Sequence, residues 1–370
     1  MKKTLVFLFL ITPSAFALEL NGTFEYLFCD IAPNNQFFLE GLLQQRYYGY
    51  NELKIILDDN KTNRFYIEDR IRHDFTNNVL YNHLEQAYIL IRPADFFYFK
   101  LGKQRIDFGI GYLWSAVNNI DKPKDVYNPR KYIFGVDGIK TNFELTLSAN
   151  LPVDVSFCVV LTTSVFYSDL SKAKFGLQTY TLVNNLELGL VSNYSKLSSN
   201  DLLIGAYFSY DIKGFILGLE YSINFLNNEN FSTVLLNLNK KISQKSFLIA
   251  EYFYNEKGYN KEKIEQFRQI INSSHDYITF SNLFVPGYFS KNYLLVDFNY
   301  EPWYDIFFGI TILANLDSFG MFLYPKLSYG RLENVTLSLE FIRNFYNEDK
   351  NEFYFLPYSH MYLLRATYYF

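Results

Sequence analysis

The sequence is poor in the residues on which most enzymes and metalloproteins depend. It has only 2 cysteines, Cys29 and Cys158, and 4 histidines, and neither type forms a metal-binding spacing. The glycine cluster 109-GIGYLW-114 is not a dinucleotide fingerprint, because Trp114 stands where the third glycine is required. We therefore predict no catalytic residue, no bound metal and no cofactor, and we do not expect an enzyme.

Long apolar runs are also missing after the first residues. No later stretch of about 18 apolar residues exists, which excludes transmembrane helices. The net charge of −4 argues against a nucleic-acid-binding protein that depends on overall positive charge. Residues 1–17, MKKTLVFLFLITPSAFA, have a basic start, a short apolar core and an A-x-A site ending at Ala17, which is typical of a cleaved signal peptide. We predict that residues 18–370 form a single domain.

Aromatic residues are abundant, with 38 Phe and 33 Tyr, yet the mean hydropathy is only −0.06. Apolar residues are therefore interleaved with polar ones. In 139-IKTNFELTLSANL-151, every odd position except Thr141 is apolar, and every even position is polar or charged. This is the alternation of a β-strand, in which successive side chains point to opposite faces.

The same period recurs along the whole chain. Strands are predicted at 20–28, 39–57, 64–74, 83–92, 96–107, 137–150, 152–166, 173–183, 185–195, 201–211, 214–226, 231–241, 246–255, 291–301, 303–315, 319–330, 333–345 and 358–370. A two-layer soluble sandwich does not normally bury so much apolar sheet. A transmembrane antiparallel β-barrel of about 18 strands accounts for it, with apolar side chains toward lipid and polar ones toward a lumen.

Connection lengths agree with a barrel whose two ends both lie in the periplasm. Short turns follow even-numbered strands, and the longest connections, 108–136, 256–290 and 346–357, follow odd-numbered ones. The chain ends on an aromatic strand with Phe370 last, resembling the strand that outer-membrane proteins present to the barrel assembly machinery. We therefore predict the outer membrane of a Gram-negative bacterium, with its lipid and that machinery as partners. The oligomeric state stays open, with a homo-oligomer among the alternatives.

Basic residues supply the functional hypothesis. In 64-RFYIEDRIR-72, Arg64, Arg70 and Arg72 share a face with Glu68, which we expect to be lumenal. The stretch from Lys100 to Lys140 contains 8 basic and 4 acidic residues. The candidate pore or substrate-binding residues are Arg64, Arg70, Arg72, Arg105, Lys122, Lys124, Arg130, Lys140, Trp114 and Tyr127. Positive charge in a pore favours anions, but simple Arg–acid pairing along the barrel wall explains the pattern equally well.

A family resemblance rests on the same stretch. LGKQRIDFG, then a tryptophan, YNPRK and GVDGIK resemble the pattern of porin-like barrels in the alginate-export group and its relatives. The matching positions are Leu101, Gly102, Gln104, Arg105, Gly109, Asn128, Pro129, Gly135, Asp137 and Lys140. The resemblance implies an 18-stranded outer-membrane channel for anionic polysaccharides or other solutes. In general porins the third outer loop folds into the lumen, so we expect residues 109–136 to narrow it.

Together these observations predict a passive outer-membrane channel for small polar, preferably anionic, solutes. One alternative is an export conduit for an anionic polysaccharide. Another is a non-conducting surface barrel whose outer loops, above all 256–290, bind a partner.

Overall fold

The period-two pattern becomes β-strand wherever the structure describes the chain. The computed structural model describes residues 17–33, 46–58, 63–75, 78–120, 124, 126, 136–148, 151–161, 173–195, 201–226, 229–260, 262, 287–332, 334–346, 351–355 and 358–370. The first nine strands are β1 (Ala17–Pro33), β2 (Arg46–Asp58), β3 (Asn63–Asp74), β4 (Val79–Ala94), β5 (Phe97–Gln104), β6 (Val136–Ser148), β7 (Leu151–Leu161), β8 (Lys174–Val183) and β9 (Leu186–Ser195). The remaining elements are β10 (Asp201–Ile212), β11 (Phe215–Leu226), β12 (Glu229–Ser243), β13 (Ser246–Asn255), β14 (Asn292–Trp303), β15 (Ile306–Asn315), β16 (Gly320–Leu332), β17 (Val335–Phe345), the 3₁₀ helix η2 (Glu352–Phe355) and β18 (Tyr358–Tyr369).

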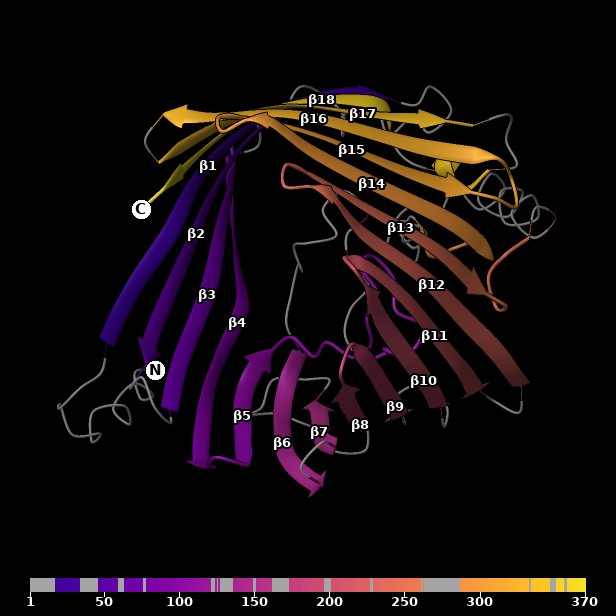
Figure 1. The fold of residues 1–370 in the computed structure, drawn as a ribbon. Helices are drawn as coiled ribbons and strands as arrows, with labels where there is room; N and C mark the ends of the chain where they lie inside the picture. The colour runs from indigo at the N-terminus through magenta and orange to yellow at the C-terminus, as the bar shows by residue number, and fades with distance from the viewer. Residues whose placement is uncertain are drawn as a thin grey trace.

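The 18 strands form one antiparallel sheet that returns to its own beginning. Each strand pairs with the next along the chain, and β1 pairs with both β2 and β18. The strands accordingly form a ring in Figure 1, from β1–β4 through β5–β9 and β10–β13 to β14–β18. The predicted all-β barrel of 18 strands is confirmed.

Most strand ends lie within four residues of the prediction, but β1 continues to Pro33 instead of ending at residue 28, and the predicted end of the seventh strand, 162–166, lies outside the described residues. The end of β5 is the informative difference. The fifth strand ends at Gln104, although the alternation predicts strand as far as residue 107. At this point side chains replace the sheet ladder: Gln104 Nε2 donates to the Gly138 carbonyl at 3.3 Å, and the Arg105 N–H donates to Gln86 Oε1 at 3.4 Å. The chain can therefore leave the wall at Arg105. The predicted start of the second strand, 39–45, lies outside the described residues.

Turn geometry reproduces the predicted parity. Most connections after even-numbered strands are two residues long, as at Asn184–Asn185 and Lys213–Gly214. Asn184 and Lys213 have φ of 55° and 53°, the left-handed backbone that tight hairpins need. The long connections follow β1, β5, β7, β13 and β17, so all five lie at the same end of the barrel. We call this the outer end.

The two faces of the wall differ in chemistry. Along β9, the side chains of Leu188 and Leu190 are exposed, whereas Val191 and Asn193 are buried. On β18, Tyr362, Leu364 and Tyr368 are likewise exposed. Large apolar side chains on the outer face are what a barrel presents to lipid. Among the described residues, no helix has the length and apolar character needed to cross a bilayer.

The seam between the first and last strands is closed by side chains on both faces. Arg365 on β18 contacts Glu25 on β1 at 2.6 Å and Glu340 on β17 at 3.0 Å. The rings of Phe24 and Phe370 stack with centroids 5.1 Å apart. These contacts add charge pairing and aromatic packing to the backbone pairing that joins the two ends of the sheet.

Candidate pore constriction

The chain turns inward immediately after β5. Residues 105–120, which we call the inner segment, contain no regular secondary structure. They run inside the ring of strands toward β10–β13 (Figure 1). An irregular backbone inside a barrel must find partners for its N–H and C=O groups. Two carboxylates on the wall supply most of the N–H partners.

Glu220 on β11 binds one half of the inner segment. Its Oε1 accepts the N–H groups of Ile110 at 2.5 Å and Gly111 at 3.0 Å. Its Oε2 accepts the N–H of Ala116 at 2.6 Å, the hydroxyl of Ser115 at 2.9 Å and the N–H of Val117 at 3.3 Å. The side chain is fully buried. A single carboxylate therefore receives five donors from a loop about a hundred residues earlier in the sequence.

Close approach to Glu220 requires glycine at position 109. Gly109 has a φ of +86°, which L-residues with side chains rarely adopt. A Cβ at this position would lie 2.3 Å from Glu220 Oε1. The glycine of the sequence cluster therefore serves a turn beside a buried carboxylate.

Glu251 on β13 binds the middle of the inner segment. It accepts the N–H groups of Tyr112, Leu113 (2.8 Å) and Trp114 (3.4 Å). Asn237 on β12 donates its side-chain amide to the same carboxylate at 2.7 Å. Glu220 and Glu251 lie on strands separated by one other strand, so together they fix the inner segment along this part of the wall.

Apolar packing fixes the other side of the inner segment. Ile106, Phe108, Val117 and Ile120 are buried against residues of β7, β9 and β10, namely Cys158, Val160, Val191 and Tyr207. Leu113 and Trp114 join a second cluster with wall residues of β12 to β18, including Leu235, Phe253, Tyr293, Leu295, Leu313, Phe322, Ile342 and Leu363. The lumenal face of these strands is therefore apolar at the outer end, contrary to the simple polar-inside pattern, because it meets a folded segment instead of water.

Wall glycines make room for this packing. A Cβ on Gly205 would lie 2.7 Å from Val117 Cγ1, and one on Gly218 would lie 2.2 Å from Ile110 Cδ1. Both positions fall on the inward face of their strands, beside buried Leu203 and Glu220. The missing side chains let the inner segment lie directly on the backbone of the sheet.

Trp114 and Lys124 are placed where they anchor the segment. Trp114 is fully buried, stacks on Phe253 with ring centroids 5.3 Å apart, and donates its indole N–H to the Gly287 carbonyl at 2.7 Å. Lys124 Nζ donates to the carbonyls of Gly111 and Tyr112 at 2.8 and 2.7 Å. Trp114 therefore joins the inner segment to Phe253 and Gly287, and Lys124 binds two carbonyl groups of the segment itself.

The wall formed by β3, β4 and β5 carries the predicted arginine cluster. Arg70 Nη1 lies 2.9 Å from Glu85, and Arg105 Nη2 lies 3.2 Å from Glu85 and 3.6 Å from Glu68. Gln86 donates to Glu68 at 2.6 Å. A bulge in β4 lets both Glu85 and Gln86 be buried on this wall. Arg70 and Arg105 therefore combine with acids, as the wall-pairing interpretation expects.

Lysines on β5 and β6 have different surroundings. Lys100 Nζ lies 5.0 Å from the centroid of the Tyr88 ring, and Lys140 Nζ lies 5.7 Å from that of Phe108. The two lysines lie within electrostatic range of each other and of Asp107, and Lys100 also of Arg64. Among the described residues, no salt bridge of either lysine occurs. This group adds a concentration of positive charge beside the inner segment.

The other predicted site residues lie partly outside the described chain. The backbone of Arg72 belongs to β3, but its side chain is not described. Lys122, Tyr127 and Arg130 fall outside the described residues. The candidate site residues did not include Glu220 and Glu251, although the alternation places both acids at inward positions in the middle of regular strands, and that placement was the available signal.

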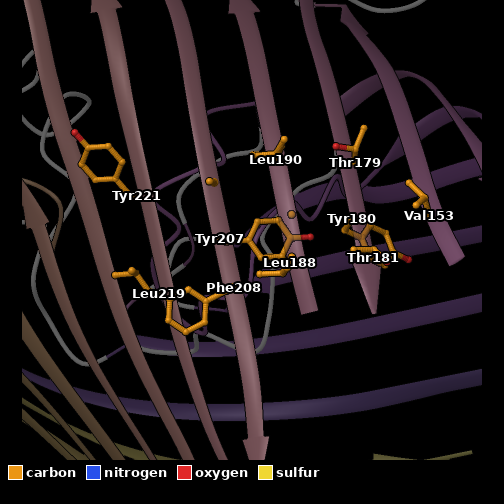
Figure 2. Close-up of a pocket in the computed structure, with 12 residues that line it drawn as sticks. Val153, Thr179, Tyr180, Thr181, Leu188, Leu190, Tyr207, Phe208, Leu219 and Tyr221 are labelled. Carbon is orange, nitrogen blue, oxygen red and sulfur yellow. The ribbon is translucent and has the colours of Figure 1, made fainter. Parts of the chain in front are cut away.

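A hollow also occurs on the opposite face of the wall. It has a volume of about 500 Å³ and lies over β7 to β11, lined mainly by apolar side chains such as Leu188, Leu190, Phe208, Leu219 and Tyr221 (Figure 2). Leu188, Leu190, Phe208 and Tyr221 are exposed, and Leu219 is half-buried on the same outward face. The hollow therefore faces the surroundings of the barrel and is separate from the inner segment.

Comparison with known proteins agrees with this architecture. No family model and no curated protein sequence matches the chain. Among solved structures, Pseudomonas aeruginosa OccD3 (OpdP) has a TM-score of 0.56 at 11% identity, covering 96% of this chain and 92% of that one. OccK3 (OpdO) of the same organism has a TM-score of 0.57 at 10% identity, covering 95% of each chain. A triple mutant of the Rhodopseudomonas blastica porin has a TM-score of 0.50 at 9% identity, covering 96% and 100%.

Identities this low show the fold alone. The fold is that of 18-stranded porins of the Gram-negative outer membrane. The alginate-export resemblance has no support from these comparisons and stays a prediction.

Proposed function

We propose that the protein is an outer-membrane channel through which small polar solutes diffuse, with a preference for anions. The observation that carries the proposal is the inner segment. It crosses the interior of the barrel and is attached by Glu220 and Glu251 to one side of the wall. A folded segment at this place narrows the lumen without belonging to a separate plug domain.

The anion preference rests on the wall beside the segment. Arg70 and Arg105 are balanced by Glu68 and Glu85. Lys100 and Lys140 lie against aromatic rings, with Arg64 and the exposed Asp107 nearby. Fixed positive charge in a narrow passage raises the local concentration of anions. The lysines, more than the paired arginines, are therefore expected to set the selectivity.

Planar bilayer recordings test both parts of the proposal. With a salt gradient across the bilayer, the reversal potential should have the sign of anion selectivity. The double substitution Lys100→Gln and Lys140→Gln should move it toward cations, because two positive charges leave the passage. Lys240→Gln is the matched control and should leave it unchanged, because Lys240 alternates with the inward residues of β12 and its ammonium lies 3.9 Å from the centroid of the Phe215 ring. Absence of conductance would contradict the channel, and cation selectivity of the unmodified protein would contradict the anion preference.

The same preparation tests the two alternatives. An export conduit for an anionic polysaccharide requires that such a polymer block or cross the pore, whereas a surface barrel requires outer-loop binding without conductance. We also propose that the barrel assembly machinery recognises the exposed aromatic residues Tyr362 and Tyr368 of β18 together with Phe370, which follows the strand.

A further inference from the structure

A buried acid joins the outer loops at the entrance. Glu352 lies in η2, within the connection between β17 and β18, and its side chain is fully buried. The carboxylate accepts hydrogen bonds from the Tyr293 hydroxyl, from Ser290 Oγ at 3.0 Å and from the Gly287 N–H at 3.4 Å. We call Gly287, Ser290, Tyr293 and Glu352 the outer clasp, because they join the end of one outer loop to the middle of another.

The outer clasp is connected to the constriction by one residue. The Gly287 N–H donates to Glu352, and the Gly287 carbonyl accepts the indole N–H of Trp114 at 2.7 Å. Phe353, next to Glu352, is buried in the same cluster as Leu113 and Trp114. A change at Glu352 therefore has a short physical route to the inner segment.

The surroundings of Glu352 are polar but contain little charge. From β14, Tyr293 is the titratable group that touches it. Asn315, the last residue of β15, donates to Ser290 at 2.6 Å, and Asp317, in the turn that follows, accepts the N–H groups of Lys291 and Asn292. Among the described residues, no salt bridge of Glu352 occurs, and the inner segment presents Trp114 and Leu113 to this region. In the part of the chain that the structure describes, the donors to the carboxyl group are all neutral.

We propose that Glu352 is a protonation-dependent latch: its neutral form keeps the outer clasp closed over Trp114, and its ionisation loosens the clasp and the inner segment beneath it. The physical reason is that burial without a cation disfavours a charged carboxylate. Any effect of this latch on conduction rests on the proposed channel function, whereas the loosening of the outer clasp itself does not depend on that function.

The direction of the pH dependence follows from linkage. Burial raises the pKa of Glu352 and outweighs the hydrogen bonds from Tyr293 and Ser290, so that the pKa is about 7 instead of 4.5. The folded-state pKa is higher than the unfolded one, so the clasp has its full stability below the ordinary pKa of glutamate. This stability is lost as the pH rises through the folded value of about 7. The clasp should thus be tighter in mildly acidic solution.

Trp114 provides a readout that does not depend on conduction. The chain has 2 tryptophans, and the other, Trp303, is exposed on β14. In a Trp303→Phe background, acrylamide quenching of Trp114 should rise several-fold as the pH increases through about 7. Glu352→Gln should abolish this step and keep the low-pH value, because a neutral amide replaces the titrating group.

Two further variants make the test decisive. Tyr293→Phe removes a donor to the carboxylate, so it should move the midpoint to higher pH. Glu256→Gln changes an exposed acid of the same outer end, whose pKa is lowered by bonds from Ser232, and should leave the midpoint in place. Quenching that is independent of pH, or a step that persists in Glu352→Gln barrels shown to be folded by heat modifiability, would overturn the proposal. A quenching step without any conductance would contradict only the channel function.

Discussion

Removal of Glu220 is the most direct test of how the constriction is held. The substitution Glu220→Ala deletes the acceptor of four backbone N–H groups and one hydroxyl while leaving those donors on the inner segment. A hydrogen bond to a charged group contributes about 1.5–3 kcal/mol. The five bonds share one acceptor and are not additive. Counting them as two effective bonds, we expect the inner segment to lose about 4 kcal/mol of local stability.

Hydrogen exchange measures this quantity on the segment itself. A loss of about 4 kcal/mol corresponds to roughly a thousandfold faster exchange for amides that exchange by local opening. Peptides covering residues 108–118 of the detergent-solubilised barrel should show the change, while peptides of β14 to β17 should not. Single-channel recordings should show larger and more variable conductance, because the segment no longer stays against the wall.

Glu340→Ala is the matched control for Glu220→Ala. Glu340 is also a buried, inward glutamate in the middle of a strand, but its partners are Arg365, Tyr324 and Lys326. Its loss should leave exchange of the inner segment unchanged. If the amides of the inner segment exchanged as slowly in Glu220→Ala as in the unmodified protein, the Glu220 carboxylate would not be what holds the segment. Apolar packing would then have to account for its position.

Two further predictions concern the wall. Gly205→Val places a side chain against Val117, so it should destabilise the inner segment by about 1–3 kcal/mol through overpacking. Hydrogen exchange of residues 115–119 should become faster. Gly330→Val, at an open position, should leave that exchange unchanged, and equal effects of the two variants would contradict a specific fit at Gly205. Arg365→Ala removes the cation shared by Glu25 and Glu340 at the seam, costing about 3 kcal/mol. The temperature at which the folded band disappears from detergent gels should fall, and it should fall further than for Arg343→Ala, an exposed arginine on the neighbouring strand.

Strand number and order were predictable because both depend on local pattern. Alternation in stretches such as 139-IKTNFELTLSANL-151 specifies which face meets lipid, and two-residue turns such as Asn184–Asn185 specify antiparallel neighbours. Where side chains replace the backbone hydrogen bonds between strands, the alternation no longer predicts the end of a strand. The fifth strand ends at Gln104 because Gln104 and Gln86 bind backbone groups there, and alternation carries no information about such contacts.

The location of the third outer loop could be anticipated, but its attachment could not. Glycine at positions 109 and 111 and the charges around them mark an unusual segment in the sequence. Only the tertiary structure brings Glu220 and Glu251 beneath it, since they lie more than a hundred positions later in the chain. Likewise, Trp114 was predicted as a pore residue from its loop, and the structure buries it against Phe253 and Gly287.

The barrel could be predicted from the sequence, because a period of two, turn residues and strand count depend on a few neighbouring positions at a time. Which lumenal charges pair, which support the inner segment and which lie beside aromatic rings depends on contacts between strands that are distant in the chain. Arg105 and Lys100 are close in sequence and similar in charge, yet one meets two buried acids and the other the face of Tyr88. The difference arises because neighbouring strands place different side chains opposite Arg105 and Lys100. Strand register and bulges determine these neighbours, and both are set only when the strands pair in the folded barrel.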